Sequence, residues 1–133
     1  MIRNKKNGFT LIELLVTATI IALLTMIGVV SFTTTNQRAR NGKRKADMEQ
    51  ARSALELYRT AIGTYPATTW STMMGALYPT YISTSTLADP KADATHSYTY
   101  VTPSPAGGSA GKTYRVCATL LEVTSAPYCL DNP

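Results

Sequence analysis

A single carboxylate inside a long apolar run is the side chain with the clearest potential for chemistry. Glu13 is the only charged residue between Phe9 and Val30. An ionised carboxylate in hydrocarbon is costly near the middle of a bilayer and less costly near its ends. Such a group is a candidate for a function that needs a charge at that depth. The alternative is a carboxylate near the membrane surface whose oxygens extend into the water.

The segment that contains Glu13 is long enough to cross a membrane. At about 1.5 Å per residue, a helix from Phe9 to Val30 would be roughly 30 Å long, which matches a hydrocarbon core. The residues before it carry three cations and no acid, namely Arg3, Lys5 and Lys6. A basic leader followed by an apolar run predicts insertion into a membrane or export.

The positive charge of the chain is local rather than spread over a surface. The formal net charge is +5, but from residue 46 onward acidic residues outnumber basic ones. A broad basic face for nucleic acid is therefore not indicated. A second group of cations follows the apolar run. It could contact phosphates, lipid head groups or acids of a neighbour, or form a solvated band. This basic cluster consists of Arg38, Arg40, Lys43, Arg44 and Lys45.

Other reactive side chains are few. Cys117 and Cys129 would form a disulfide in an exported domain, worth about 3 kcal/mol in the chain-entropy model, and would stay thiols in a reducing compartment. We expect His96, which has no sequence-suggested base or nucleophile, to lie on the surface. Asp89 and Asp93 are too few for a metal site, and we expect them in a solvated loop. No catalytic, cofactor or metal site is predicted, and no enzyme activity.

Apolar spacing predicts one long helix over residues 9–62. Its first half is apolar all round, and its second half is apolar on one face, with charged side chains opposite. Gly63, with a Tyr-Pro pair shortly after it, marks the end of the helix. The apolar face of the second half consists of Met48, Ala51, Leu55, Tyr58 and Ile62.

The rest of the chain predicts a small antiparallel sheet. Residues 70–78 suggest a short helix capped by Thr69 or Ser71. Strand-like segments follow at 97–102 and 113–123, and a third is possible at 126–130. A Pro/Gly/Ser-rich turn joins the first two strands. Because so few strands need a partner to pack on, the predicted fold class is α+β, with the sheet on the second half of the long helix.

The residues from Asn7 to Val16, NGFTLIELLV, resemble the prepilin cleavage and methylation motif of type IV pilins and type II secretion pseudopilins. The resemblance implies that prepilin peptidase, a membrane aspartyl protease, cuts between Gly8 and Phe9 and methylates the new amine of Phe9. It also implies that Glu13 serves in assembly. A new α-ammonium group from a neighbouring subunit and the Glu13 carboxylate would each offset the desolvation of the other.

The same resemblance implies an organisation for the whole chain. Residues 1–8 would be a cleaved leader, 9–35 a transmembrane and filament-core helix, and 36–133 the helix continuation with a globular pilin head. Cys117 and Cys129 are similar to a pilin C-terminal disulfide loop. Two positions depart from the family pattern: Ala22 and Val30 stand where many members have a glycine and a proline.

The function implied is that of a structural subunit that polymerises with copies of itself into a type IV pilus-like filament. Its partners would be prepilin peptidase, the pilus assembly machinery and, before assembly, the membrane. The alternative is a pseudopilin of type II secretion or DNA uptake, or a minor pilin with a DNA-binding or adhesive role. The precursor would cross the inner (cytoplasmic) membrane once, and the filament would be extracellular or periplasmic. The basic cluster competes with the leader for the cytoplasmic side, so orientation rests on the motif.

Overall fold

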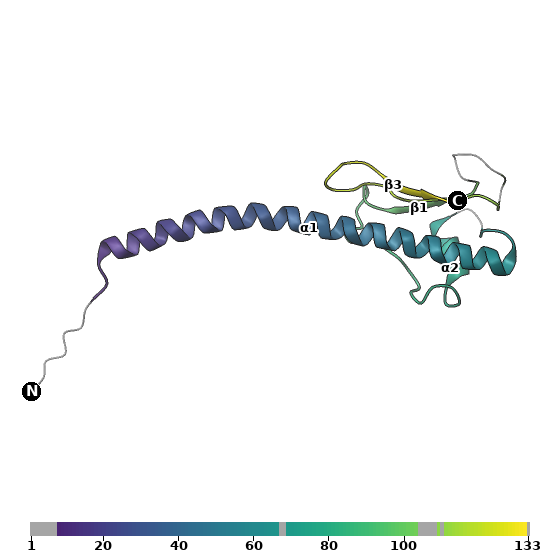
Figure 1. Ribbon diagram of the computed structural model, residues 1–133, viewed down its shortest axis with the longest axis horizontal. Coiled ribbons are helices and arrows are strands. Elements are labelled where there is room, and N and C mark those ends of the chain that lie inside the picture. Colours follow the sequence, from purple (N-terminus) through teal and green to yellow (C-terminus); the bar gives the residue numbers. More distant parts are fainter. Residues whose placement is uncertain (1–7, 67–68, 104–108, 110, 133) are drawn as a thin grey trace, which may run out of the picture. The chain divides into compact units, whose positions relative to one another are not determined.

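The computed structural model describes residues 8–66, 69–103, 109 and 111–132. The chain divides into two compact units, Met1–Asn36 and Gln37–Pro133, and we call the second unit the head. Most of the predicted leader and most of the turn predicted at 103–111 lie outside the described residues. The elements, in chain order, are α1 (Leu11–Ile62), α2 (Trp70–Leu77), β1 (Tyr98–Val101), β2 (Arg115–Ala118) and β3 (Tyr128–Asp131) (Figure 1).

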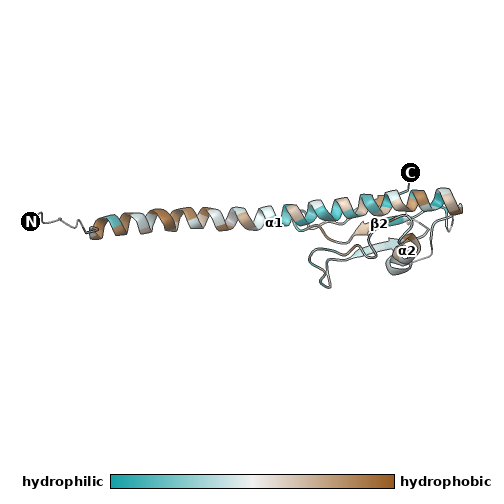
Figure 2. Ribbon diagram, turned by 90° about the horizontal axis from the view of Figure 1, so that it is seen from below, coloured by the Kyte–Doolittle hydropathy of each residue, from teal (hydrophilic) through white to brown (hydrophobic). Residues whose placement is uncertain are grey.

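In the first unit, α1 exposes its apolar side chains on every side. Figure 2 shows this part of the helix as largely hydrophobic. Within the described residues, α1 is the one helix long and apolar enough to cross a membrane. Threonine hydroxyls in the apolar run donate to backbone carbonyl oxygens of the same helix, so these polar groups need no water. Among the donors are Thr17, Thr19 and Thr25.

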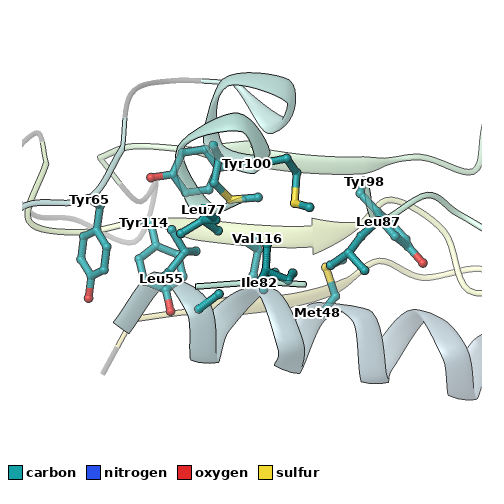
Figure 3. Packing of buried hydrophobic residues seen from close by; sticks show 14 of the residues in the cluster. Met48, Leu55, Tyr65, Leu77, Ile82, Leu87, Tyr98, Tyr100, Tyr114 and Val116 are labelled. Atoms are coloured by element: carbon teal, nitrogen blue, oxygen red, sulfur yellow. The ribbon is translucent and has the colours of Figure 1, made fainter. Parts of the chain in front are cut away.

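The predicted α+β class is confirmed in the head, where a three-stranded antiparallel sheet of order β1-β2-β3 packs on the second half of α1. Side chains of α1, α2, the sheet and the segment between α2 and β1 meet in one core (Figure 3). This burial of apolar area is the main stabilising contribution to the head. Labelled core residues include Met48, Leu55, Leu77, Ile82, Leu87, Tyr98, Tyr100, Tyr114 and Val116.

The predicted apolar stripe of α1 is confirmed for Met48, Ala51 and Leu55, which are fully buried. The prediction is wrong for Ile62, whose side chain is 57% exposed. Tyr65 and Tyr114 pack edge to face, with ring centroids 4.6 Å apart, and fill that end of the core instead. Ile62 lies in the last helical turn and is left in solvent.

The ends of the helices follow the sequence closely. Gly63 has φ +88° and donates its N–H to the carbonyl oxygen of Arg59, as a glycine C-cap does. Thr69 is the N-cap of α2, and its hydroxyl oxygen accepts the N–H of Thr72. β2 is much shorter than the predicted 113–123 strand, because the chain turns back after it and Leu121 exchanges backbone hydrogen bonds with Ser125 and Ala126.

A disulfide joins the central strand β2 to the edge strand β3. Cys117 of β2 and Cys129 of β3 are direct register partners, with Cα atoms 4.1 Å apart. Val116 and Ala118 on either side point into the core, so the disulfide lies on the outer face of the sheet. It closes the loop between β2 and β3, which also carries Glu122.

Candidate functional site

The candidate site is the start of α1, where Thr10 and Glu13 form a reciprocal capping box. The Thr10 backbone N–H donates to Glu13 Oε2 at 2.9 Å, and the Thr10 hydroxyl donates to the same oxygen at 2.8 Å. The Glu13 N–H donates in return to Thr10 Oγ1 at 3.3 Å. Two otherwise unpaired N–H groups of the first turn are thereby satisfied. The helix therefore begins at Leu11, two residues later than predicted.

The role of Thr10 was missed in the sequence, although its signal was present. A Ser or Thr followed three residues later by Glu, just before an apolar run, is the capping-box pattern. The resemblance described above implies a partner for the Glu13 carboxylate only in a neighbouring subunit. In the structure Thr10 supplies two hydrogen bonds to it, so the charge is partly compensated before any second subunit is present.

The bond between Gly8 and Phe9 is open on all sides in the described chain. The Phe9 side chain is 86% exposed. A Cβ added at Gly8 would meet no atom within 4 Å. The fold of this chain itself therefore does not require glycine at residue 8. A requirement for glycine would have to come from a protein that approaches this bond.

Residues 3–29 match the family model described as the prokaryotic N-terminal methylation motif. The chain carries a prepilin-type N-terminus. The motif is typical of type IV pilins and pseudopilins, and the match contains Gly8, Phe9, Thr10 and Glu13. No curated protein and no solved structure matches the chain.

The prepilin-type N-terminus bears on the processing, the assembly and the location of the protein, but not on the kind of filament. It implies processing by prepilin peptidase and assembly into a pilus-like filament. With the apolar α1 it is consistent with a membrane precursor that later becomes part of a pilus at the surface. Pilin family proteins are structural and not enzymatic, so the match supports the expectation that this pilin-like protein is not an enzyme.

The head divides the basic cluster into buried and exposed members. Arg44 is fully buried, and its guanidinium donates to both oxygens of Asp89 at 2.6 and 2.7 Å. The same group donates to Asn41 Oδ1 at 2.8 Å and to Glu122 Oε1 at 3.0 Å. Arg40 Nε donates to Glu122 Oε1 at 2.6 Å. Arg44 is thus unavailable for an outside contact, whereas Arg38, Lys43 and Lys45 are exposed.

The two carboxylates of this buried network are both favoured in their ionised forms. Hydrogen bonds from Arg40, and then from Arg44, lower the pKa of Glu122 to about 2. Burial opposes ionisation of Asp89, but hydrogen bonds from Arg44 and from the Lys91 N–H outweigh it and lower the pKa of that carboxyl. Both groups therefore link the stability of the head to pH in the same direction.

The head is expected to lose stability as the pH falls from about 4.5 to about 2. Glu122 has a lower pKa in the folded than in the unfolded chain, so its contribution is complete above the unfolded pKa and disappears as the folded pKa is approached. We expect a loss on the order of 2 kcal/mol from this group. Thermal unfolding followed by circular dichroism at several pH values measures it. Glu122→Gln should flatten this dependence, and an unchanged slope in that variant would contradict the assignment.

Two predictions from the sequence are wrong: His96 does not lie on the surface, and Asp89 does not lie in a solvated loop, because both side chains are buried. His96 is only 5% exposed because residues 93–96 form a tight turn, in which Asp93 Oδ1 accepts the His96 N–H at 2.8 Å and lies 2.7 Å from His96 Nδ1. Hydrogen bonds from Thr95, and then from His96, lower the pKa of Asp93. Within the described residues, no group of three or more potential ligands could hold a metal ion.

Proposed function

We propose that this protein is a structural subunit of a type IV pilus-like filament, cut between Gly8 and Phe9 and methylated at Phe9. The observation that carries the proposal is the match of residues 3–29 to the methylation motif, placed at the start of an exposed apolar helix. In the filament the apolar part of α1 would form the core, and the heads would lie outside. The apolar side chains would then exchange lipid for the helices of neighbouring subunits.

In this proposal Glu13 selects the incoming subunit. Cleavage creates an α-ammonium group on Phe9, and both this cation and the Glu13 carboxylate are poorly solvated in lipid. The capping box fixes the carboxylate in the first turn, next to the new chain end. A subunit already in the filament would contribute the partner charge, so pairing would set the axial register of the newcomer.

Mass spectrometry of the mature protein tests the processing step, and electron microscopy of sheared cell surfaces tests assembly. We expect a mature chain that begins at N-methylated Phe9. Gly8→Val is the matched control: because the chain itself has room for a side chain there, the variant should fold but remain uncut. A mature N-terminus beyond residue 30 would contradict the proposal.

The form of the polymer separates the two finer roles. Extended surface filaments built mainly from this chain would identify a pilin. A short polymer confined to the envelope would identify a pseudopilin of a secretion or DNA-uptake system.

A further inference from the structure

A groove with a basic rim lies where α1 enters the head. Its α1 side is formed by Arg38, Asn41, Gly42 and Lys45, and its other side by the loop between β2 and β3. We call it the basic groove. Arg38, Gly42 and Lys45 recur at spacings of four and three, so they share one helix face. The loop contributes Leu121, Val123 and Thr124.

The cations at this groove are not neutralised by the head. Arg38, Lys43 and Lys45 are exposed, and no salt bridge involves them within the described residues. Lys45 is positioned by Tyr128, whose ring centroid lies 5.3 Å from its Nζ. On the loop side, Val123 is 50% exposed beside these charges. The surface therefore combines unpaired positive charge with an exposed apolar side chain.

A second copy of the chain offers this groove little complementary charge. Most head carboxylates that are exposed or half-buried in the described part of the chain are already paired with a cation. These pairs are Glu49 with Arg52, Asp93 with Lys91, Asp131 with Arg115, and Glu122 with Arg40. The carboxylate of Glu56 accepts hydrogen bonds from the hydroxyls of Tyr65 and Tyr114. The charge of the groove thus points to an anion that is not supplied by another head.

The position of the groove along the chain favours lipid over nucleic acid. Arg38 follows Val30, the last residue of the apolar run, by only eight residues of sequence. The chain therefore keeps the groove near the surface of a membrane that the apolar run crosses. An exposed Val123 could contact the apolar acyl chains that lie beneath the phosphates of a membrane. The phosphate backbone of a nucleic acid has no such apolar layer.

We propose that the basic groove binds the phosphate groups of anionic phospholipids while the precursor is in the membrane. Arg38 and Lys45 contact phosphates, Lys43 adds attraction from the neighbouring helix face, and Val123 enters the head-group layer. This inference rests on the membrane precursor of the proposed function. It does not depend on filament formation.

The test uses the full-length precursor in nanodiscs of phosphatidylcholine alone or of phosphatidylcholine mixed with phosphatidylglycerol. A water-soluble amine-acylating reagent is added, and its rate at each lysine is followed by mass spectrometry. We expect acylation of Lys45 to slow about fivefold in the anionic nanodiscs, with a smaller effect at Lys43. The protection should disappear at high salt. Lys91 and Lys112, elsewhere in the head, serve as internal controls and should react equally in both lipids.

Two variants and one competitor complete the design. Arg38→Gln should reduce the protection of Lys45, whereas the matched Lys91→Gln should not. Equal rates at Lys45 in the two lipids would overturn the proposal. So would stronger protection by a short DNA duplex in phosphatidylcholine nanodiscs than by phosphatidylglycerol, which would assign the groove to nucleic acid. Because no filament is needed, failure here leaves the assembly role of Glu13 unaffected, and failure of assembly leaves this measurement valid.

Discussion

Replacing Glu13 with glutamine is expected to leave cleavage at Gly8–Phe9 intact and to reduce incorporation into filaments about a hundredfold. The amide keeps a hydrogen-bond acceptor for Thr10, so the first turn of α1 still forms. It removes the negative charge that would pair with a neighbour's α-ammonium group, and that cation is then left unpaired in an apolar environment. The amounts of mature subunit in sheared filaments and in membranes measure the effect.

Two controls separate the charge of Glu13 from its capping role. Thr10→Val removes the hydroxyl of the capping box but keeps the carboxylate, and should cost only about 1 kcal/mol of helix stability. Thr17→Leu removes a polar group from the same apolar segment and should assemble normally. Normal filaments from Glu13→Gln would contradict the proposed ion pair. Equal defects in Glu13→Gln and Thr10→Val would reassign Glu13 to helix capping.

Replacing Arg44 with methionine is expected to lower the free energy of unfolding of the head by about 3–5 kcal/mol. Methionine fills much of the volume but leaves Asp89 and Glu122 with fewer cationic partners. Asp89 suffers most, because Arg44 alone binds both of its oxygens. Urea unfolding of the full chain in detergent, followed by the fluorescence of Trp70, measures the loss.

The control for this experiment is Arg38→Met, which removes an exposed arginine from the same stretch of α1 and should change stability by less than about 0.5 kcal/mol. Combining Arg44→Met with Asp89→Asn should recover part of the loss, because a neutral amide is cheaper to bury than an unpaired carboxylate. If Arg44→Met were no more destabilising than Arg38→Met, the buried network would not contribute to folding.

The features predicted correctly from the sequence depend on neighbours along the chain. Helical spacing identified Met48 and Leu55 as core, and Gly63 as a cap, because each depends on residues within two turns. The sequence could not show in this way which members of the basic cluster are buried and which are exposed. Arg44 finds Asp89 and Glu122 at separations of 45 and 78 residues, and no local pattern encodes which of five cations turns inward.

The predicted surface position of His96 was wrong for a related reason. A histidine without an evident partner is usually exposed, but here a turn starting at Asp93 folds the ring inward. The capping box was a different kind of omission. Its pattern is local, because Thr10 precedes Glu13 by three residues at the start of an apolar run, so the sequence alone is sufficient to predict it.

The disulfide restricts the positions open to Glu122, a residue that it does not contact. Cys117 and Cys129 are 12 residues apart, and Glu122 lies in the loop they close. A closed loop samples fewer positions than an open one, so it presents the Glu122 carboxylate to Arg40 and Arg44 at a higher effective concentration. The covalent link on one face of the sheet therefore makes burial of a charge on α1 less costly in entropy. Formation of the disulfide and formation of the ion pair between Glu122 and Arg44 are therefore thermodynamically coupled: each makes the other more favourable.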